Sequence, residues 1–253
     1  MLPHLLSPVS AHCAACGCLS GVLDGLPLCA GCARQLLRAQ QSFEALCPRC
    51  LSVSVPGRPC PVCKRDPGHL ITRTFAPYRY RGVVRGLVLR LKFSGDTQAA
   101  ALLAPAMAKV LREAEADLLM PVPLGPRRER ERGYNQSGLL AMLVGHLRGI
   151  PMGEELIRVR DTKRQSGIHS ILERSRNMDG AFSMRSGANV RNRRILLVDD
   201  VRTSGATALA CARVLREAGA ADVSLLCAAI APGAGRYFTG AKKTRGIFRR
   251  KDR

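Results

Sequence analysis

Ile195-Leu-Leu-Val-Asp-Asp-Val-Arg-Thr-Ser-Gly-Ala-Thr207 is the stretch of sequence that decides the fold. Its first four residues are apolar and predict a buried strand, which runs into two adjacent carboxylates. A short turn with hydroxyl side chains then opens a helix expected over residues 206–218. Such a turn gathers backbone N–H groups and a helix N-terminus at one point, and Gly205 lets the backbone approach an anion closely. The stretch therefore predicts a phosphate-binding turn at the carboxyl end of a strand.

The side chains of this turn suit a phosphorylated sugar. Thr203, Ser204 and Thr207 offer hydroxyl donors to a phosphate. The adjacent carboxylates of Asp199 and Asp200 suit two neighbouring sugar hydroxyls, and they can hold Mg²⁺ through its waters. The combination predicts 5-phosphoribosyl 1-pyrophosphate (PRPP) with Mg²⁺ as the ligand. The alternative, a plain strand end followed by a helix cap, explains the hydroxyls but not two carboxylates beside an anion site.

The rest of residues 70–231 alternates between expected strands and helices. Apolar spacing predicts strands over residues 72–80, 118–122, 156–159, 194–198 and 222–230. Helices are expected over 83–92, 99–116, 137–148 with Ser137 as the cap, and 206–218, whereas 124–136 and 160–177 are expected to be polar loops. Strands separated by helices indicate βαβ units, so the predicted fold class is α/β with a parallel sheet flanked by helices.

The loop over residues 124–136 is crowded with arginine. Charge runs are often plain solvated surface, and that alternative stays open here. The position favours a binding role, because a loop after the strand over 118–122 should face the same crevice as Asp199. The pyrophosphate of PRPP needs cations there. The expected contacts are Arg132, with Asn135 and Gln136 as amide donors.

Cysteine spacing predicts metal sites in the first part of the chain. Nine of the eleven cysteines precede residue 64, and eight of them form four pairs with the same two-residue gap. Two such turns complete a closed tetrahedral site for Zn²⁺, so four pairs predict two structural zinc ions. A sequential pairing is the simplest, an interleaved one stays open, and free thiols or redox pairs are the alternative to metal. The predicted ligands are Cys13, Cys16, Cys29 and Cys32, then Cys47, Cys50, Cys60 and Cys63.

Composition divides the chain and limits its partners. Residues 1–69 are too cysteine-rich and short to build a large core, residues 70–231 carry the α/β pattern, and residues 232–253 form a basic tail. A net charge of +21 favours polyanions such as nucleic acid, although aromatic residues make up only 4% of the chain and argue against extensive base stacking. No apolar run is long enough to span a membrane and no export signal is evident, so a cytoplasmic location is expected.

Residues 199–207 resemble the PRPP-binding motif of type I phosphoribosyltransferases. With the four cysteine pairs, three further segments make the chain similar to the ComF family, which joins a double zinc ribbon to a phosphoribosyltransferase-like domain. Those segments are Leu91-Lys-Phe-Ser-Gly-Asp96; Pro121-Val-Pro-Leu124 with Arg132-Gly-Tyr-Asn-Gln136; and Thr162, Gln165, Arg174, Asn177 and Gly180-Ala-Phe182. The loop over residues 160–177 resembles the mobile hood of these domains.

The resemblance implies roles for the residues of the motif. The acidic pair would hold the ribose hydroxyls at the catalytic centre, and the following loop would hold the 5-phosphate. Ser204 stands where the family usually has threonine, and its hydroxyl is retained. The implied PRPP-binding residues are Asp199, Asp200, Thr203, Ser204, Gly205, Ala206 and Thr207.

Three functions follow as expectations. The ComF resemblance implies a role in DNA uptake during natural competence, or in the use of external DNA, with single-stranded DNA as the favoured nucleic acid and proteins of the uptake machinery as partners. One alternative is an active phosphoribosyltransferase that joins PRPP to a nitrogenous acceptor and releases pyrophosphate. Another is a PRPP-sensing regulator that binds nucleic acid. A PRPP site does not by itself establish turnover, because binding and catalysis need different groups.

Overall fold

The computed structural model describes residues 12–19, 27–40, 46–52, 54–60, 63–64, 70–161 and 178–231. Residues 162–177 of the loop that resembles a hood, and the basic tail, lie outside the described residues. The elements are α1 (Ala30–Arg38), β1 (Thr74–Phe75), β2 (Tyr78–Arg79), α3 (Gly82–Phe93), α4 (Gln98–Lys109), β3 (Leu118–Pro121), α5 (Pro126–Arg132), α6 (Gln136–Arg148), β4 (Leu156–Arg158), β5 (Phe182–Met184), β6 (Arg194–Arg202), α8 (Ala206–Glu217) and β7 (Asp222–Ile230).

A five-stranded parallel sheet forms the centre of the molecule, as the sequence predicts. β6 lies between β3 and β7, and both β1 and β2 pair with the other edge of β7. The register places Ile195 opposite Leu118 on one side and Val223 on the other. Pro77 separates β1 from β2, so the single strand expected over residues 72–80 is two short ones. The fold is therefore α/β with a parallel sheet.

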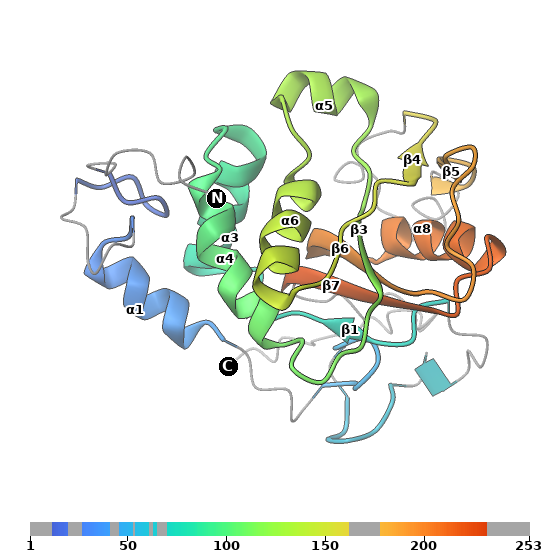
Figure 1. Cartoon of the computed structure of the whole chain (residues 1–253). Coiled ribbons are helices and arrows are strands. Elements are labelled where there is room, and N and C mark those ends of the chain that lie inside the picture. Colours follow the sequence, from blue (N-terminus) through green and yellow to red (C-terminus); the bar gives the residue numbers. More distant parts are fainter. Residues whose placement is uncertain are drawn as a thin grey trace, which may run out of the picture.

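Alternate residues of β6 face opposite helical layers. Ile195 and Leu197 join the buried cluster that contains the apolar face of α8, whereas Leu196 and Val198 join the cluster formed with α3, α4 and α6. Because side chains alternate along a strand and both faces are covered, a continuous apolar run is what a central parallel strand requires. Figure 1 shows α3, α4 and α6 on one side of the sheet and α8 on the other.

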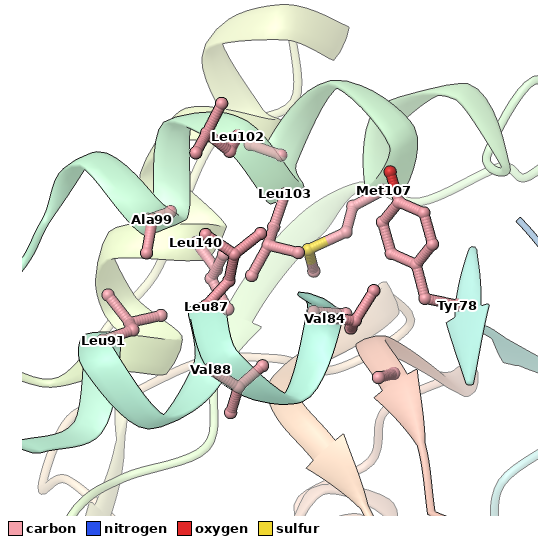
Figure 2. Close-up of a cluster of buried hydrophobic side chains, with 14 of the residues drawn as sticks. Tyr78, Val84, Leu87, Val88, Leu91, Ala99, Leu102, Leu103, Met107 and Leu140 are labelled. Carbon is pink, nitrogen blue, oxygen red and sulfur yellow. The ribbon is translucent and has the colours of Figure 1, made fainter. Parts of the chain in front are cut away.

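Buried apolar side chains between the sheet and helices α3, α4 and α6 hold the C-terminal end of α3 near the sheet. Figure 2 shows Leu87 and Leu91 of α3 packed toward Leu103 of α4 and Leu140 of α6. All four side chains have no solvent exposure. Truncating such a leucine to alanine costs about 2–5 kcal/mol of stability. This packing holds Lys92, the next residue along α3, beside the carboxyl end of β6.

Several expected elements differ in the structure. Residues 126–132, expected to be loop, form α5, which begins with Pro126 at its first position and ends at Gly133 with a left-handed φ of 78°. α4 ends at Lys109 rather than at residue 116. The cap of α6 is Asn135, not Ser137, because the Asn135 side chain accepts the Ser137 N–H at 3.0 Å.

The expected strand over residues 156–159 does not join the central sheet. β4 pairs antiparallel with β5, which the sequence did not predict, and the two form a separate two-stranded sheet. β6 is longer than expected, since it continues past Val198 to Arg202. The two carboxylates of the motif therefore belong to the strand itself.

The cysteine-rich segment packs against the α/β body. Leu28 and Leu36 belong to the same buried cluster as α3. The carbonyl of Ala15 approaches α3 at Gly86, where a Cβ would lie 3.0 Å from that oxygen. Gln40 bridges to Tyr78 at the edge of the sheet. The domain boundary near residue 70 stays a prediction. Among the described residues, no helix has the length and apolar character to cross a bilayer.

Candidate functional site

A cavity of about 630 Å³ opens at the carboxyl ends of β3 and β6. Ligands of open α/β sheets bind at this edge, because the loops there leave a crevice. Besides apolar groups, the lining includes cationic, acidic, hydroxyl and aromatic side chains. They are Tyr80, Lys92, Phe93, Arg128, Glu131, Arg132, Tyr134, Gln136, Ser137, Arg158, Asp199, Asp200, Thr203 and Thr207.

Asp200 is a buried carboxylate with one paired and one unpaired oxygen. The residue is 3% exposed. Its Oδ1 lies 2.8 Å from Nζ of Lys92, whereas its Oδ2 is buried and has no hydrogen-bond partner among the described residues. A buried acceptor without a partner costs free energy, so such groups mark places where a ligand, ion or water completes the site. The second oxygen of Asp200 is thus available to a ligand donor or a hydrated cation.

Asp199 is held beside it by a hydroxyl and by the backbone. Its Oδ1 accepts from Ser137 Oγ at 3.2 Å and from the Asp200 N–H at 2.9 Å. Burial and the neighbouring Asp200 carboxylate raise the pKa of Asp199 to about 7. Burial acts to lower the pKa of Lys92, but the Asp200 carboxylate outweighs it, so that pKa is raised and the ammonium stays charged.

The turn after β6 contains the glycine and the helix start on which the sequence-based prediction of an anion site rests. Gly205 has a φ of 82° and precedes the first turn of α8, whose N–H groups have no acceptor within the helix. Thr203 and Thr207 line the large cavity. Gly205 and Ala206 line a small adjoining cavity of about 20 Å³. Ser204 lines neither cavity: it is buried, and its Oγ accepts from the Ala206 N–H at 3.4 Å.

Not all of the ligand contacts that the sequence predicts within residues 126–136 line the cavity. Arg132 donates to Gln136 Oε1 at 2.8 Å and lies over the Phe93 ring at 5.2 Å, and all three line the cavity. Asn135 does not line it. Its side chain caps α6 and donates to the Val122 carbonyl at 3.1 Å. Asn135 therefore fixes the turn that presents Arg132 and Gln136.

Sequence reasoning assigned no role to several residues of the cavity. Lys92 lies within Leu91-Lys-Phe-Ser-Gly-Asp96, where only the family resemblance drew notice to it. Its pairing with Asp200 depends on the packing of α3 against the sheet. Asp96, the last residue of that motif, has a local role, since it pairs with Arg90 Nε at 3.3 Å and accepts the Gln98 N–H at 3.2 Å. The other missed residues are Tyr80, Phe93, Arg128, Tyr134, Ser137 and Arg158.

The eight paired cysteines lie in two groups, and the grouping is the sequential one. Within each group all four sulfur atoms lie within 4.8 Å of one another. Cys16 Sγ lies 3.9 Å from Cys29 Sγ, and Cys50 Sγ lies 3.6 Å from Cys60 Sγ. A Zn–S distance of about 2.3 Å in a tetrahedron gives S–S edges of about 3.8 Å. Both groups could therefore hold a tetrahedral Zn²⁺.

Backbone donors favour the thiolate form that a metal needs. The Cys32 N–H donates to Cys29 Sγ at 3.4 Å, and the Ala15 N–H lies 3.5 Å from Cys13 Sγ. Burial acts to raise the pKa of Cys13, but backbone N–H groups outweigh it and lower the pKa to about 6. At Cys47, too, burial acts to raise the pKa, but backbone N–H groups outweigh it and lower the pKa to about 7. Burial raises the pKa of Cys32, Cys50 and Cys63 instead, so only some thiols of each group favour the thiolate form before a metal binds.

Solved structures similar to this chain include phosphoribosyl-transferring enzymes. A purine phosphoribosyltransferase from Pyrococcus horikoshii is 18% identical, with coverage of 53% of this chain and 73% of that one and a TM-score of 0.36. A glutamine PRPP amidotransferase from Bacillus subtilis is 26% identical, with coverage of 50% and 25% and a TM-score of 0.35. No family model matches the chain.

Sequence relatives cover more of the chain. The DNA utilization protein YhgH of Salmonella typhimurium is 33% identical over 209 residues, which cover 79% of this chain and 88% of that protein. The protein of the same name from Escherichia coli K12 is 31% identical over 199 residues, with coverage of 75% and 86%. The competence protein ComFC of Bacillus subtilis is 29% identical over 204 residues, with coverage of 78% and 81%. With relatives this similar over most of both chains, the protein belongs to the ComF family, together with YhgH and ComFC.

Proposed function

We propose that this protein acts in the uptake or use of external DNA, and that its cavity binds PRPP together with Mg²⁺. The names of its relatives, DNA utilization protein and competence protein, support the first part. The buried carboxylate of Asp200 carries the second part, because one oxygen is neutralised by Lys92 and the other has no partner among the described residues. A ribose diol or the water shell of Mg²⁺ supplies the missing donor.

The charges around the cavity match a sugar with phosphate at both ends. The turn over residues 203–207 and the N-terminus of α8 receive the 5-phosphate. Arg128, Arg132 and Arg158 line the cavity and offset the charge of the pyrophosphate. Lys92 does not compete for the phosphates, because its ammonium is engaged by Asp200.

Zinc in this proposal is structural. Each cysteine group supplies four thiolates and leaves no open position for a substrate. Thiolate ligands persist in a reducing compartment, so the proposal places the protein in the cytoplasm. The metal replaces the apolar core that a segment of this size lacks.

Nucleic acid is the proposed macromolecular partner, because the relatives are named for DNA utilization and competence, and single-stranded DNA is the form that we propose. The net charge of +21 supplies the long-range attraction. The tail adds Lys and Arg outside the described residues. Such binding is independent of sequence and weakens with salt.

Phosphoribosyl transfer is the second candidate function. Tyr80, Phe93 and Tyr134 line the cavity in a chain that has ten phenylalanines and tyrosines in all. A planar nitrogenous acceptor can pack on such rings. Its nitrogen would form the new bond to C1 of the ribose as the bond to pyrophosphate breaks, with Asp199 and Asp200 holding the sugar. Release of pyrophosphate in the presence of a panel of bases would favour this candidate.

Calorimetric titration of the zinc-loaded protein tests the PRPP site. Wild type should bind PRPP in a Mg²⁺-dependent manner, and more tightly than ribose 5-phosphate or inorganic phosphate. Asp200→Asn removes a charged acceptor, which is worth about 1.5–3 kcal/mol, or roughly ten- to a hundredfold in affinity. Glu113→Gln, at an exposed carboxylate that does not line the cavity, is the matched control and should bind like wild type. Wild-type binding of PRPP no tighter than free phosphate would contradict the proposed site.

A further inference from the structure

Arg202, the last residue of β6, connects the phosphate-binding turn with the second cysteine group. The residue is buried, with 7% of its surface exposed. Its Nη1 donates to the backbone carbonyl of Cys50, which is one of the four cysteines of that group. A segment near the N-terminus thus supplies the acceptor for a buried cation beside the turn.

The same guanidinium also lies against the turn itself. A Cβ at Gly205 would lie 3.3 Å from Nε of Arg202 and 3.8 Å from its Nη2. The small cavity at the turn is lined by Arg202, Thr203, Gly205 and Thr207, among others. The guanidinium therefore lies between the Cys50 carbonyl and the backbone of the turn, within van der Waals reach of Gly205.

Further contacts make the second cysteine group part of the same packed unit. The carbonyl of Arg49, next to Cys50, accepts the N–H of Thr74 in β1 at 2.7 Å. Leu51, on the other side of Cys50, is buried in the cluster that also contains Ala206 and Ala208 of α8. The carbonyl of Cys50 is thereby fixed relative to the sheet as long as its own turn is ordered.

Loss of order at the second cysteine group would leave Arg202 in an unfavourable state. A guanidinium stays charged, and a buried charge that loses its acceptor destabilises the folded state. The strand end and the turn would have to rearrange to return it to water. The first group has no such contact with the turn among the described residues, since Cys13 and Cys32 pack in the cluster with α3.

We propose that Arg202 is a positioning residue that couples zinc at Cys47, Cys50, Cys60 and Cys63 to anion binding at the turn over residues 203–207. This inference rests on the proposed function of the cavity. Coupling between two sites is reciprocal: zinc in the second group raises the affinity of the turn for PRPP, and PRPP stabilises that zinc site by the same factor. The first cysteine group is not coupled.

Thiol alkylation of the full zinc-loaded chain tests the coupling with an internal control. Iodoacetamide labelling is followed by mass spectrometry with and without PRPP and Mg²⁺, after calorimetry has measured PRPP binding. We expect PRPP to slow labelling of Cys50 and Cys63 by at least about fivefold, the low end of typical coupling factors. Labelling of Cys16 and Cys29 in the first group should not change.

Substitutions at Arg202 then test whether this residue transmits the coupling. Arg202→Met should abolish the selective protection, and Arg202→Lys, which retains a donor for the Cys50 carbonyl, should restore part of it. Arg213→Met, an exposed arginine of α8, is the matched control and should behave as wild type. The wild-type comparison stands even where Arg202→Met does not fold.

The outcomes separate this inference from the proposed function. Tight PRPP binding with equal protection of both cysteine groups, or with none, would overturn the coupling and leave the PRPP site intact. Selective protection that persists in folded Arg202→Met would overturn the role of Arg202. Absence of PRPP binding in the calorimeter would overturn the proposed site and the coupling with it.

Discussion

Nζ of Lys92 lies 2.8 Å from Oδ1 of Asp200, and the two residues come from opposite ends of the α/β body in sequence. The pair joins α3 to β6 at the cavity. The Asp200 side chain is 4% exposed and that of Lys92 is 23% exposed, so water screens the pair only from the lysine side. The lysine neutralises a charge that the sheet would otherwise hold unpaired.

Replacing Lys92 by methionine should therefore destabilise the protein. The variant leaves a buried carboxylate without its cation, and we expect a loss of about 3 kcal/mol, the lower end for buried pairs because Lys92 is partly exposed. Urea unfolding of zinc-loaded protein measures it. The double variant Lys92→Met with Asp200→Asn should regain most of this loss, since the Asp200 charge is removed together with its cation. Equal losses in the single and double variants would show that Lys92 acts through packing alone.

The raised pKa of Asp199 predicts a specific dependence of stability on pH. The protonated carboxyl is favoured in the folded state, so its contribution is complete below the ordinary pKa of 3.8 and is lost as pH rises to about 7. Asp199→Asn is neutral throughout. The stability of this variant relative to wild type should increase between about pH 4 and pH 7 and stay level above that.

Urea unfolding at pH 5 and at pH 8 tests this difference. Comparison with wild type at each pH cancels the titration of groups that do not interact with Asp199, including the zinc thiolates. A relative stability of Asp199→Asn that is the same at both pH values would contradict the pKa shift.

Metal analysis should find about two Zn²⁺ per chain in protein purified without added zinc, since two groups of four thiols are present. Cys47→Ser should lower the content to about one. Cys18→Ser is the matched control: its Sγ lies 3.3 Å from that of Cys16, yet it is exposed and outside both groups. A fall in zinc content in Cys18→Ser, or no zinc in wild type, would contradict the assignment.

Deletion of residues 242–253 should weaken nucleic-acid binding mainly through charge. The deletion removes seven Lys and Arg and one Asp. Each phosphate that the protein no longer neutralises makes the dependence of log affinity on log salt shallower, by about 0.7 for single strands. Fluorescence anisotropy with labelled single-stranded DNA across a salt series measures the slope. Replacing the seven basic residues by serine at unchanged length should give the same slope as the deletion, and an unchanged slope would place the binding surface elsewhere.

The sequence predicts the central sheet well because its signals are local. The apolar runs of β6 and β7 predict buried strands from a few consecutive residues. The turn at Gly205 has the left-handed φ that glycine permits. α5 was missed because a run of Arg and Glu is typical of a solvated loop, whereas Arg127 and Glu131 pair at 2.9 Å along one helix face. β5 was missed because a three-residue strand has almost no pattern of its own.

The site shows the same division between local and distant information. The sequence could bring Asp199, Thr203 and Thr207 together at one cavity because they adjoin one turn. The role of Lys92 could not, because it arises only when α3 packs across the sheet. For Asn135 the sequence predicts a ligand contact that the fold does not provide. Its side chain already caps α6 and donates to the Val122 carbonyl.

The continuation of β6 through both carboxylates has an entropic consequence. Asp199, Val201 and Arg202 are in register with β7, on either side of Asp200. The backbone freedom of the acidic pair is therefore lost when the chain folds and not when a ligand arrives, at roughly 1–2 kcal/mol per residue. An acidic pair on a flexible loop would add that ordering to every binding event. Here a cation or a diol meets carboxylates that are already oriented, and association depends on entry into the cavity rather than on rearrangement of the pair.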